Sequence, residues 1–306
     1  MRAVTYDSYA PDDSKLHYGS VADPKVGPGQ VLIQVKAAAV NPVDWKVMAG
    51  GLDGMMDSVF PVVPGWDVAG VVTRTGPDTP EFAVGDEVMS YARKDVVSAG
   101  TFAEYVAVAA PHVARKPAGL SWEQAAGLPL AGLTALRSMD RLGVGVGDVL
   151  LVHGAAGGVG SIAVQLGVAR GARVIGTASE RNHSFVRGLG GEPVTYGDGV
   201  VERVRALSPG GVSVVSDFVG GQLETTLAVL APGGRHASIA DPSVIEQGGE
   251  WLWVRPDGAK LAELAALVDA GKLTVEVAET YPLDKVGAAF EASRGGHTRG
   301  KLVIVP

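Results

Sequence analysis

The sequence predicts an α/β protein in which a doubly wound parallel sheet is joined to a second, β-rich domain. From residue 120 to residue 256, short apolar runs alternate with helix-like segments, a rhythm typical of a parallel sheet covered by helices. Before residue 120, short apolar–polar runs are separated by frequent glycine and proline, which favours a barrel or compact sheet. Residues 257–306 hold a helix that ends near Gly271 and a final apolar strand.

The composition excludes several classes of protein. Hydrophobic residues make up 46% of the chain and charged residues 19%, which excludes a disordered protein. Cysteine is absent, so disulfides, thiolate nucleophiles and cysteine-bound metals are excluded. The net charge is −7 and no basic run occurs, so we expect no nucleic-acid partner. No apolar run reaches the roughly 18–20 residues of a membrane span, and no signal-peptide core is present, so we expect a soluble, cytoplasmic protein without a membrane partner.

The individual elements follow from local patterns. In the first region, apolar–polar runs predict strands at 31–40, 67–76, 86–92 and 101–110, and the weakly periodic segment 50–58 is expected to be a mobile loop. In the second region, a helix is predicted over 121–139, where Ser121 and Gln124 form a capping-box pattern.

Six strands are predicted after this helix, at 148–152, 173–177, 193–196, 212–219, 235–240 and 251–254. Helices are predicted between them, at 158–170, 181–189, 200–207 and 222–230. Six strands are the full count of a dinucleotide-binding domain.

A glycine-rich turn lies directly after the first of these strands and directly before a helix. It consists of Gly154, Ala155, Ala156, Gly157, Gly158, Val159 and Gly160. Glycine lets the backbone approach a pyrophosphate, and the helix N-terminus offers unpaired N–H groups. From Ala155 the pattern is A-x-G-x-x-G, with alanine at the first glycine position. The turn therefore predicts a dinucleotide site, and the alternative is a turn that only packs a helix on a strand.

The end of the second strand bears on the choice of cofactor. A site for NAD places Asp or Glu about 20 residues after the glycines, where it binds the ribose hydroxyls. Here Ser179 and Arg181 can bind a 2′-phosphate, and Tyr196 can add a hydroxyl. We therefore expect NADP(H). Two alternatives stay open: Glu180 becomes the ribose ligand if the register slips by one position, or Arg181 is only a solvated residue in the first turn of the helix.

Seven segments occur in an order that carries a family resemblance. They are Asn41-Pro42-Val43-Asp44, PVVPGWDVAG (61–70), GDEV (85–88), GTFAEY (100–105), LAGLTA (130–135), HGAAGGVG (153–160) and GKLVIVP (300–306). Together they resemble the zinc-independent quinone oxidoreductase branch of the medium-chain dehydrogenase/reductase superfamily. The resemblance implies a GroES-like catalytic domain built from residues 1–119 and 257–306. It also implies a Rossmann NADP-binding domain over 120–256, with the active-site cleft at the junction.

Two departures from the zinc-dependent relatives bear on metal binding. Those relatives carry Cys where Asn41 stands and Gly-His-Glu where Gly65-Trp66-Asp67 stands, so both ligand positions are lost. None of the six histidines forms a closely spaced pair. We therefore expect no metal. Many quinone reductases of this branch have Tyr where Trp45 stands, and Trp45 keeps an aromatic wall without a phenolic proton donor.

The resemblance also implies site residues. The catalytic candidates are Asn41, Trp45 and Thr134, with Asn41 and Thr134 near the nicotinamide. The candidates that line the carboxyl edge of the sheet beside it are Val219, Ser238 and Ala240. Ordinary alternatives exist, because Asn41 before a proline also fits a turn, and Asp44 also fits a local cap.

The predicted function is an NADPH-dependent oxidoreductase that transfers a hydride to a quinone or another activated C=C bond, such as an enone. Alternatives are an enoyl-thioester reductase and a non-catalytic NADPH-binding protein. The expected partner is a small electrophilic substrate. We also expect a homodimer, because the apolar segment 250–255 is the last strand of the sheet and an exposed apolar edge strand needs cover.

Overall fold

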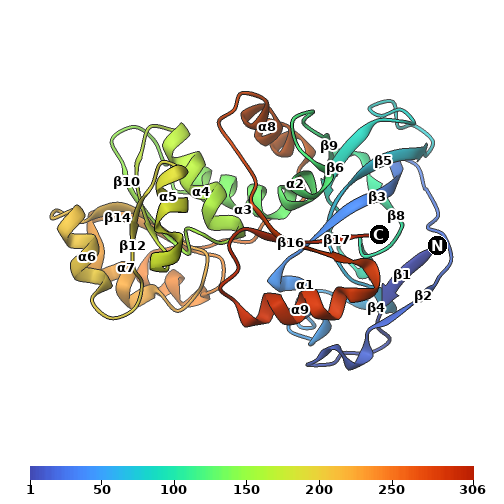
Figure 1. Cartoon of the computed structure of the whole chain (residues 1–306), viewed down its shortest axis with the longest axis horizontal. Helices are drawn as coiled ribbons and strands as arrows, with labels where there is room; N and C mark the ends of the chain where they lie inside the picture. The colour runs from blue at the N-terminus through green and yellow to red at the C-terminus, as the bar shows by residue number, and fades with distance from the viewer. The chain divides into compact units, whose positions relative to one another are not determined.

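The computed structural model describes residues 1–306, which form two compact units. The β-rich unit consists of Met1–Leu130, Arg255–Gly271 and Val275–Pro306, and the parallel-sheet unit of Ala131–Val254 and Lys272–Thr274. Both ends of the chain, marked in Figure 1, therefore belong to the β-rich unit. The domain limits after residues 119 and 256 remain predictions, and the compact units divide after Leu130 and after Val254.

The parallel-sheet unit contains one six-stranded sheet in the order β12-β11-β10-β13-β14-β15. Its strands are β10 (Val149–His153), β11 (Arg173–Thr177), β12 (Glu192–Val194), β13 (Val212–Asp217), β14 (Leu230–Ser238) and β15 (Glu250–Trp251). All its strand pairs are parallel. In chain order the sheet reads 3-2-1-4-5-6, the doubly wound order of dinucleotide-binding folds, and it reverses between β10 and β13.

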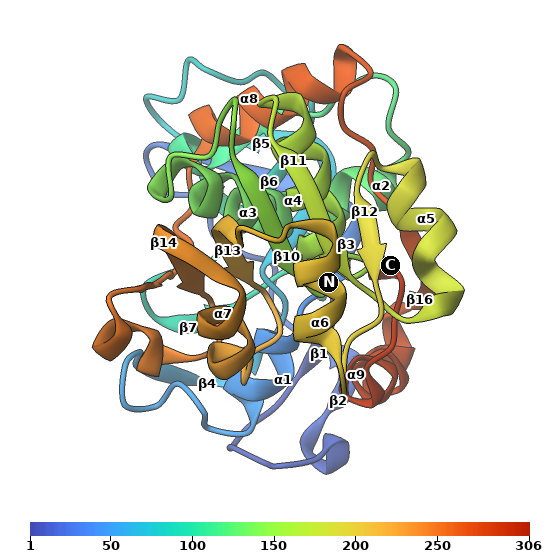
Figure 2. The ribbon, with the colours of Figure 1, turned by 90° about the vertical axis from the view of Figure 1, so that its left-hand side faces the viewer.

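Helices surround this sheet, as Figure 2 shows. They are α3 (Pro129–Arg141), α4 (Gly158–Ala169), α5 (His183–Gly188), α6 (Val200–Leu207) and α7 (Leu223–Val229). The sheet core is fully buried at Leu151, Ile175 and Val215. Helix α4 packs so closely on the sheet that a Cβ atom at Gly167 would lie 2.8 Å from the side chain of Val174 and 2.9 Å from that of Leu150.

The β-rich unit is built around a sheet in the order β16-β17-β3-β5-β6-β9, with β8 also paired to β3. These strands are β3 (Gln30–Val40), β5 (Asp67–Thr75), β6 (Glu87–Tyr91), β8 (Tyr105–Ala109), β9 (Val113–Arg115), β16 (Val277–Pro282) and β17 (Lys301–Val305). Two further pairs are formed by β1 (Arg2–Thr5) with β2 (His17–Ser20) and by β4 (Ser58–Val63) with β7 (Val97–Ala99).

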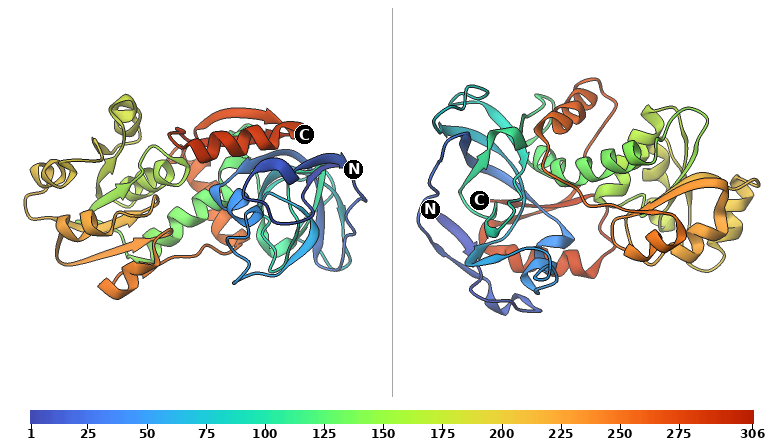
Figure 3. Two further views of the ribbon diagram at one scale, coloured as in Figure 1. Left: turned by 90° about the horizontal axis from the view of Figure 1, so that it is seen from below. Right: turned by 180° about the vertical axis from the view of Figure 1, so that it is seen from behind.

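The C-terminal strand joins the N-terminal part of the chain. β17 pairs antiparallel with β3, so that Leu302 lies opposite Val40, and Figure 3 shows both chain ends in this unit. The helices of the unit are α1 (Pro42–Met48), α2 (Trp122–Gly127), α8 (Gly258–Asp269) and α9 (Val286–Gly295). No helix in the chain has the length and apolar character that crossing a membrane requires.

Two elements differ from the expectations. The predicted helix over 121–139 is two helices, since α2 ends at Gly127 and α3 begins at Pro129. Proline has no N–H group and disfavours a helical residue before it, which accounts for the break. The predicted strand at 251–254 is only Glu250–Trp251, because its partner β14 ends at Ser238, opposite Trp251.

Candidate active site

The glycine-rich turn connects β10 to α4 and is fixed against the next strand. The Gly154 N–H donates to Thr177 Oγ1 at 3.0 Å, and the Ala155 N–H donates to the Thr177 carbonyl at 2.9 Å. Gly154 has a φ of +75°, in the left-handed region that favours glycine. The turn is therefore held at the carboxyl end of β11.

The first turn of α4 has the properties of an anion site. A side chain at Gly160 would overlap the carbonyl oxygen of Gly154, so only glycine lets the helix start this close to the turn. The N-cap residue is Gly157, which has no side chain that could accept from the first N–H groups of the helix. The N–H groups of Gly158 and Val159 are thus left for a ligand, and the positive end of the helix dipole lies there. This turn fits the diphosphate of a dinucleotide.

The residues predicted to choose the cofactor lie around the end of β11. Ser179 precedes a short 3-10 turn, Glu180–Asn182, and its hydroxyl accepts from Asn182 Nδ2 at 3.2 Å. Glu180 and Arg181 are exposed in that turn. The Ala178 N–H donates to the carbonyl of Val194, two residues before the half-exposed Tyr196. The structure therefore brings the segments that carry Ser179 and Tyr196 together at one edge of the sheet.

Asp217 organises the carboxyl ends of β13 and β14, and the sequence analysis did not single it out. It is buried, and its carboxylate accepts from the N–H of Val219 at 2.9 Å and from the Ser238 hydroxyl at 2.8 Å. The Ser238 oxygen in turn accepts from the Ala240 N–H at 3.2 Å. Asp217 thus bonds Val219 and Ser238 directly, and Ala240 joins them through the Ser238 hydroxyl. The sequence signal that could have identified Asp217 is a polar residue at the end of a buried strand.

Asn41 lies in a buried polar cluster of the β-rich unit. Its backbone N–H donates to Asp44 Oδ2 at 2.8 Å, and its Nδ2 donates to Asp67 Oδ2 at 2.9 Å. The ammonium of Lys301 donates to Asn41 Oδ1 and, at 3.0 Å, to the Val40 carbonyl. Both polar atoms of the Asn41 amide are therefore bonded inside this cluster, and its place beside a nicotinamide remains a prediction.

Lys301 and Asp67 complete this set, which we call the Asn41 cluster: Asn41, Asp44, Asp67 and Lys301. The ammonium lies 3.9 Å from Asp67 Oδ2, and Asp67 Oδ1 accepts from the Leu130 N–H at 2.8 Å. Burial raises the pKa of Asp67 to about 6 against the opposing effects of Lys301 and Asn41. Burial lowers the pKa of Lys301. A charged residue at the start of the apolar strand KLVIV was the sequence signal for this lysine.

The other two catalytic candidates lie elsewhere. Trp45 Nε1 donates to Ser293 Oγ on α9 at 3.1 Å, and the Arg294 guanidinium lies 5.7 Å from the centre of the Trp45 ring system. The side chain of Trp45 is therefore bonded to α9 and not to the Asn41 cluster. Thr134 is buried on α3, in the parallel-sheet unit. The catalytic roles of both residues remain predictions.

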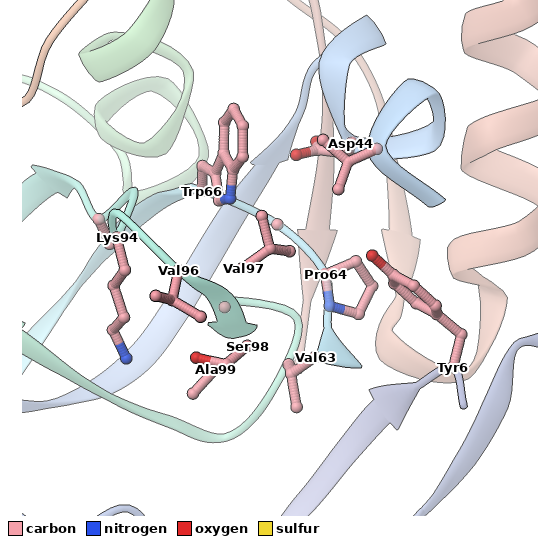
Figure 4. Close-up of a pocket in the computed structure, with 14 residues that line it drawn as sticks. Tyr6, Asp44, Val63, Pro64, Trp66, Lys94, Val96, Val97, Ser98 and Ala99 are labelled. Atoms are coloured by element: carbon pink, nitrogen blue, oxygen red, sulfur yellow. The ribbon is translucent and has the colours of Figure 1, made fainter. Parts of the chain in front are cut away.

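A pocket lies next to the Asn41 cluster within the β-rich unit (Figure 4). Its cavity volume is about 10 Å³, which is room for about one water molecule. It is lined by Tyr6, Asp44, Val47, Val63, Pro64, Gly65, Trp66, Ala92, Lys94, Val96, Val97, Ser98, Ala99 and Gly100. Trp66, at a position where zinc-dependent relatives have a ligand, packs edge-on against Tyr91 with ring centroids 6.1 Å apart. No group of three or more His, Asp or Glu residues in the chain is arranged to hold a metal ion.

The fold and these sites define a class of protein, a nicotinamide-dependent dehydrogenase or reductase. Family models agree: "Alcohol dehydrogenase GroES-like domain" matches residues 27–118, and "Zinc-binding dehydrogenase" matches residues 189–304. The chain belongs to the medium-chain dehydrogenase/reductase superfamily, in its zinc-independent quinone oxidoreductase-like branch. The predicted resemblance and fold class are confirmed.

Similar proteins include two curated plant enzymes and a solved bacterial structure. The chloroplastic NADPH-dependent alkenal/one oxidoreductase of Arabidopsis thaliana is 33% identical over all of this chain and 80% of that protein. The 2-methylene-furan-3-one reductase of Solanum lycopersicum is 35% identical over all of this chain and 79% of that protein. The quinone oxidoreductase from Coxiella burnetii is 34% identical, with a TM-score of 0.89 over all of this chain and 99% of that chain.

Proposed function

We propose that this protein is an NADPH-dependent reductase of conjugated carbonyl compounds, that is, enones and quinones. The single observation that carries the proposal is the turn Gly154–Gly157, held at the end of β11 and followed by the uncapped N-terminus of α4. The names of the relatives support the acceptor class, since they include an alkenal/one oxidoreductase and a quinone oxidoreductase.

The chain's own residues would hold the cofactor in three places. The backbone from Gly154 to Gly160 would bind the diphosphate, and Ser179, Arg181 and Tyr196 would bind the 2′-phosphate. Val219, Ser238 and Ala240 would line the nicotinamide, with Asn41 and Thr134 near it. When bound, NADPH supplies the hydride. The preference for NADPH over NADH rests on Ser179 and Arg181, which follow the end of β11, where an NAD site carries an acid.

Conjugated acceptors suit the residues that replace the zinc ligands of relatives. Hydride addition to a simple ketone places a full charge on one oxygen, which zinc stabilises as a Lewis acid in zinc-dependent relatives. Asn41 and Trp66 stand at the positions of those ligands. A conjugated acceptor spreads the charge into an enolate or hydroquinone anion, so neutral hydrogen-bond donors suffice.

We further propose a cytoplasmic homodimer. β15 is the edge strand of the six-stranded sheet, and Trp251 on it is 39% exposed. A second copy that continues the sheet would cover this apolar edge. A mass near 31 kDa by light scattering at micromolar concentration would count against the dimer.

The function is tested by incubating the protein with NADPH and 2-cyclohexenone or 1,4-benzoquinone, and identifying products by gas chromatography. We expect cyclohexanone or hydroquinone in amounts equal to the NADPH consumed. NADPH binding without any product would instead indicate a non-catalytic binding protein. Turnover of enoyl thioesters alone would assign the alternative reductase activity.

A further inference from the structure

The loop that carries Tyr196 is rich in glycine. It runs from residue 195 to residue 199, between β12 and α6, at the edge of the sheet where β12 lies beside β11 (Figure 2). Gly197 has a φ of +82° and Gly199 a φ of +75°, both in the left-handed region that glycine adopts readily. Glycine loses more conformational freedom on folding than any other residue. A loop of this composition therefore keeps one shape only where other groups hold it.

Arg203, on α6, supplies the bonds that hold this loop. Its Nε donates to the Thr195 carbonyl at 2.9 Å, and its Nη2 donates to the Asp198 carbonyl at 2.8 Å. A longer bond, at 3.5 Å, joins Nη2 to the Gly197 carbonyl. The guanidinium group has donors on several nitrogens in one plane, so a single side chain can bond carbonyls on both sides of Tyr196.

The same loop is bonded to the segment predicted to choose the cofactor. The carbonyl of Val194, which precedes the loop, accepts from the Ala178 N–H at 2.9 Å. The Thr195 hydroxyl lies 3.4 Å from His183 Nε2, at the start of α5. Ala178 comes directly before Ser179 in the chain, and His183 follows the turn after it. The loop is therefore tied to the turn that carries Ser179.

We propose that Arg203 is a positioning residue for recognition of the 2′-phosphate of NADPH, and that it acts through Tyr196. The proposal rests on the proposed function, which assigns the 2′-phosphate to Ser179, Arg181 and Tyr196. Tyr196 is 48% exposed and its hydroxyl forms no hydrogen bond within the protein, so this donor is available to a ligand. A donor on a loop that is already fixed loses less conformational entropy on binding, which strengthens its bond to the phosphate.

The bonds of the Arg203 side chain go to this loop alone, and the side chain forms no ion pair. Arg205, two residues further along α6, also donates to backbone carbonyls. Its partners are Ala228, at 2.8 Å, and Pro209, at 3.4 Å. Arg205 therefore makes the same kind of bond from the same helix without holding the loop, which makes it the matched control.

Binding of 2′,5′-ADP and of 5′-AMP tests the proposal by calorimetric titration, because the two nucleotides differ only in the 2′-phosphate. We expect the wild-type protein to bind 2′,5′-ADP more tightly. Arg203→Met should weaken 2′,5′-ADP binding about tenfold, the contribution of one hydrogen bond to a charged group, and leave 5′-AMP binding unchanged. Arg205→Met should bind both nucleotides as the wild type does. Unchanged 2′,5′-ADP binding in Arg203→Met, or an equal loss for both nucleotides, would overturn the proposal.

A double-mutant cycle tests whether Arg203 acts through Tyr196. Tyr196→Phe removes the hydroxyl that the loop presents, so adding Arg203→Met to it should weaken 2′,5′-ADP binding little further. Losses that add in the double variant would overturn the positioning role and indicate that the guanidinium binds the phosphate itself.

Arg203→Lys gives the same test if Arg203→Met does not fold. It keeps the charge and loses the planar set of donors, so it should weaken 2′,5′-ADP binding by a smaller factor and leave 5′-AMP binding unchanged. Binding of 2′,5′-ADP equal to that of the wild type would show that the charge alone matters, and would overturn the positioning role.

These titrations need no acceptor and no turnover, which separates this proposal from the proposed function. If the protein reduces no acceptor but Arg203→Met loses affinity for 2′,5′-ADP alone, the positioning role stands although the reductase activity has failed. If the wild-type protein binds the two nucleotides equally, it does not recognise the 2′-phosphate, and the proposal is overturned whatever the reductase activity is.

Discussion

The ammonium of Lys301 donates a hydrogen bond to the side-chain oxygen of Asn41, which joins the last strand of the chain to the end of β3. The two residues are 260 positions apart in the sequence. Because the same amide donates to Asp67, one lysine fixes the orientation of Asn41 and neutralises a buried carboxylate. The C-terminal segment is therefore part of the site and does more than close the sheet.

Replacing Lys301 with methionine should destabilise the protein strongly. The change leaves Asp67 as a buried charge without a cation and Asn41 Oδ1 without a donor. The free energy of unfolding should fall by about 3–5 kcal/mol in urea denaturation. Lys260→Met is the control, since Lys260 pairs with Glu263 on the surface and such pairs contribute about 0–1 kcal/mol. Equal effects of the two changes would show that the buried ammonium has no special role.

The buried Asp44 should make stability depend on pH. Burial raises the pKa of this carboxyl group from its ordinary value of 3.8, which the unfolded chain regains, to about 8 in the folded protein. Between these values the folded protein holds a proton that the unfolded chain has released, so the free energy of unfolding should fall as pH rises from about 4 to about 8. Asp44→Asn removes this contribution. Wild-type and variant stabilities that run parallel over this range would contradict the raised pKa.

Gly160→Ala should impair cofactor binding. The added methyl group would overlap the backbone oxygen of Gly154, so the turn must move away from the start of α4. We expect NADPH affinity, measured by fluorescence titration, to fall at least about tenfold. Gly188→Ala is the control, because a methyl group there meets no atom within 4 Å and lies in helix α5. If both variants bind NADPH as the wild type does, the glycine turn is not the diphosphate site.

Arg181→Ala should reduce the preference for NADPH. Loss of a charged partner of the 2′-phosphate costs about 1.5–3 kcal/mol, whereas NADH has no phosphate there and should bind unchanged. Arg187→Ala, an exposed change on α5, serves as the control in the same titrations. Equal affinities of the wild-type protein for NADPH and NADH would reverse the assignment and favour Glu180 as the ribose ligand.

The sequence predicted the structural features that depend on a local pattern of residues. The alternation of strands and helices and the turn Gly154–Gly160 were enough for the doubly wound sheet, which the structure and the relatives confirm. The cap between Asn41 and Asp44 also lies within one helix turn and was foreseen as an alternative. In contrast, the bond from Lys301 to Asn41 depends on how β17 pairs with β3, and no sequence spacing encodes that pairing.

The direction of individual side chains was the second feature that the sequence could not predict. The bond of Trp45 to Ser293 depends on the packing of α9, which a pattern in residues 41–48 does not contain. Likewise, Tyr6 Oη and Asp44 Oδ1 are buried without a hydrogen-bond partner, which is visible only once every neighbour is placed, because an orphaned group is defined by what does not reach it.

A matched pair of acceptors tests most directly whether the protein reduces conjugated carbonyl compounds with NADPH. NADPH oxidation is followed at 340 nm with 3-penten-2-one and with 2-pentanone, which differ only in the conjugated C=C bond. The proposed function predicts steady oxidation with the enone, formation of 2-pentanone as its product, and no oxidation with 2-pentanone itself. Oxidation with the saturated ketone at an equal or higher rate, or with neither compound nor any quinone, would contradict it.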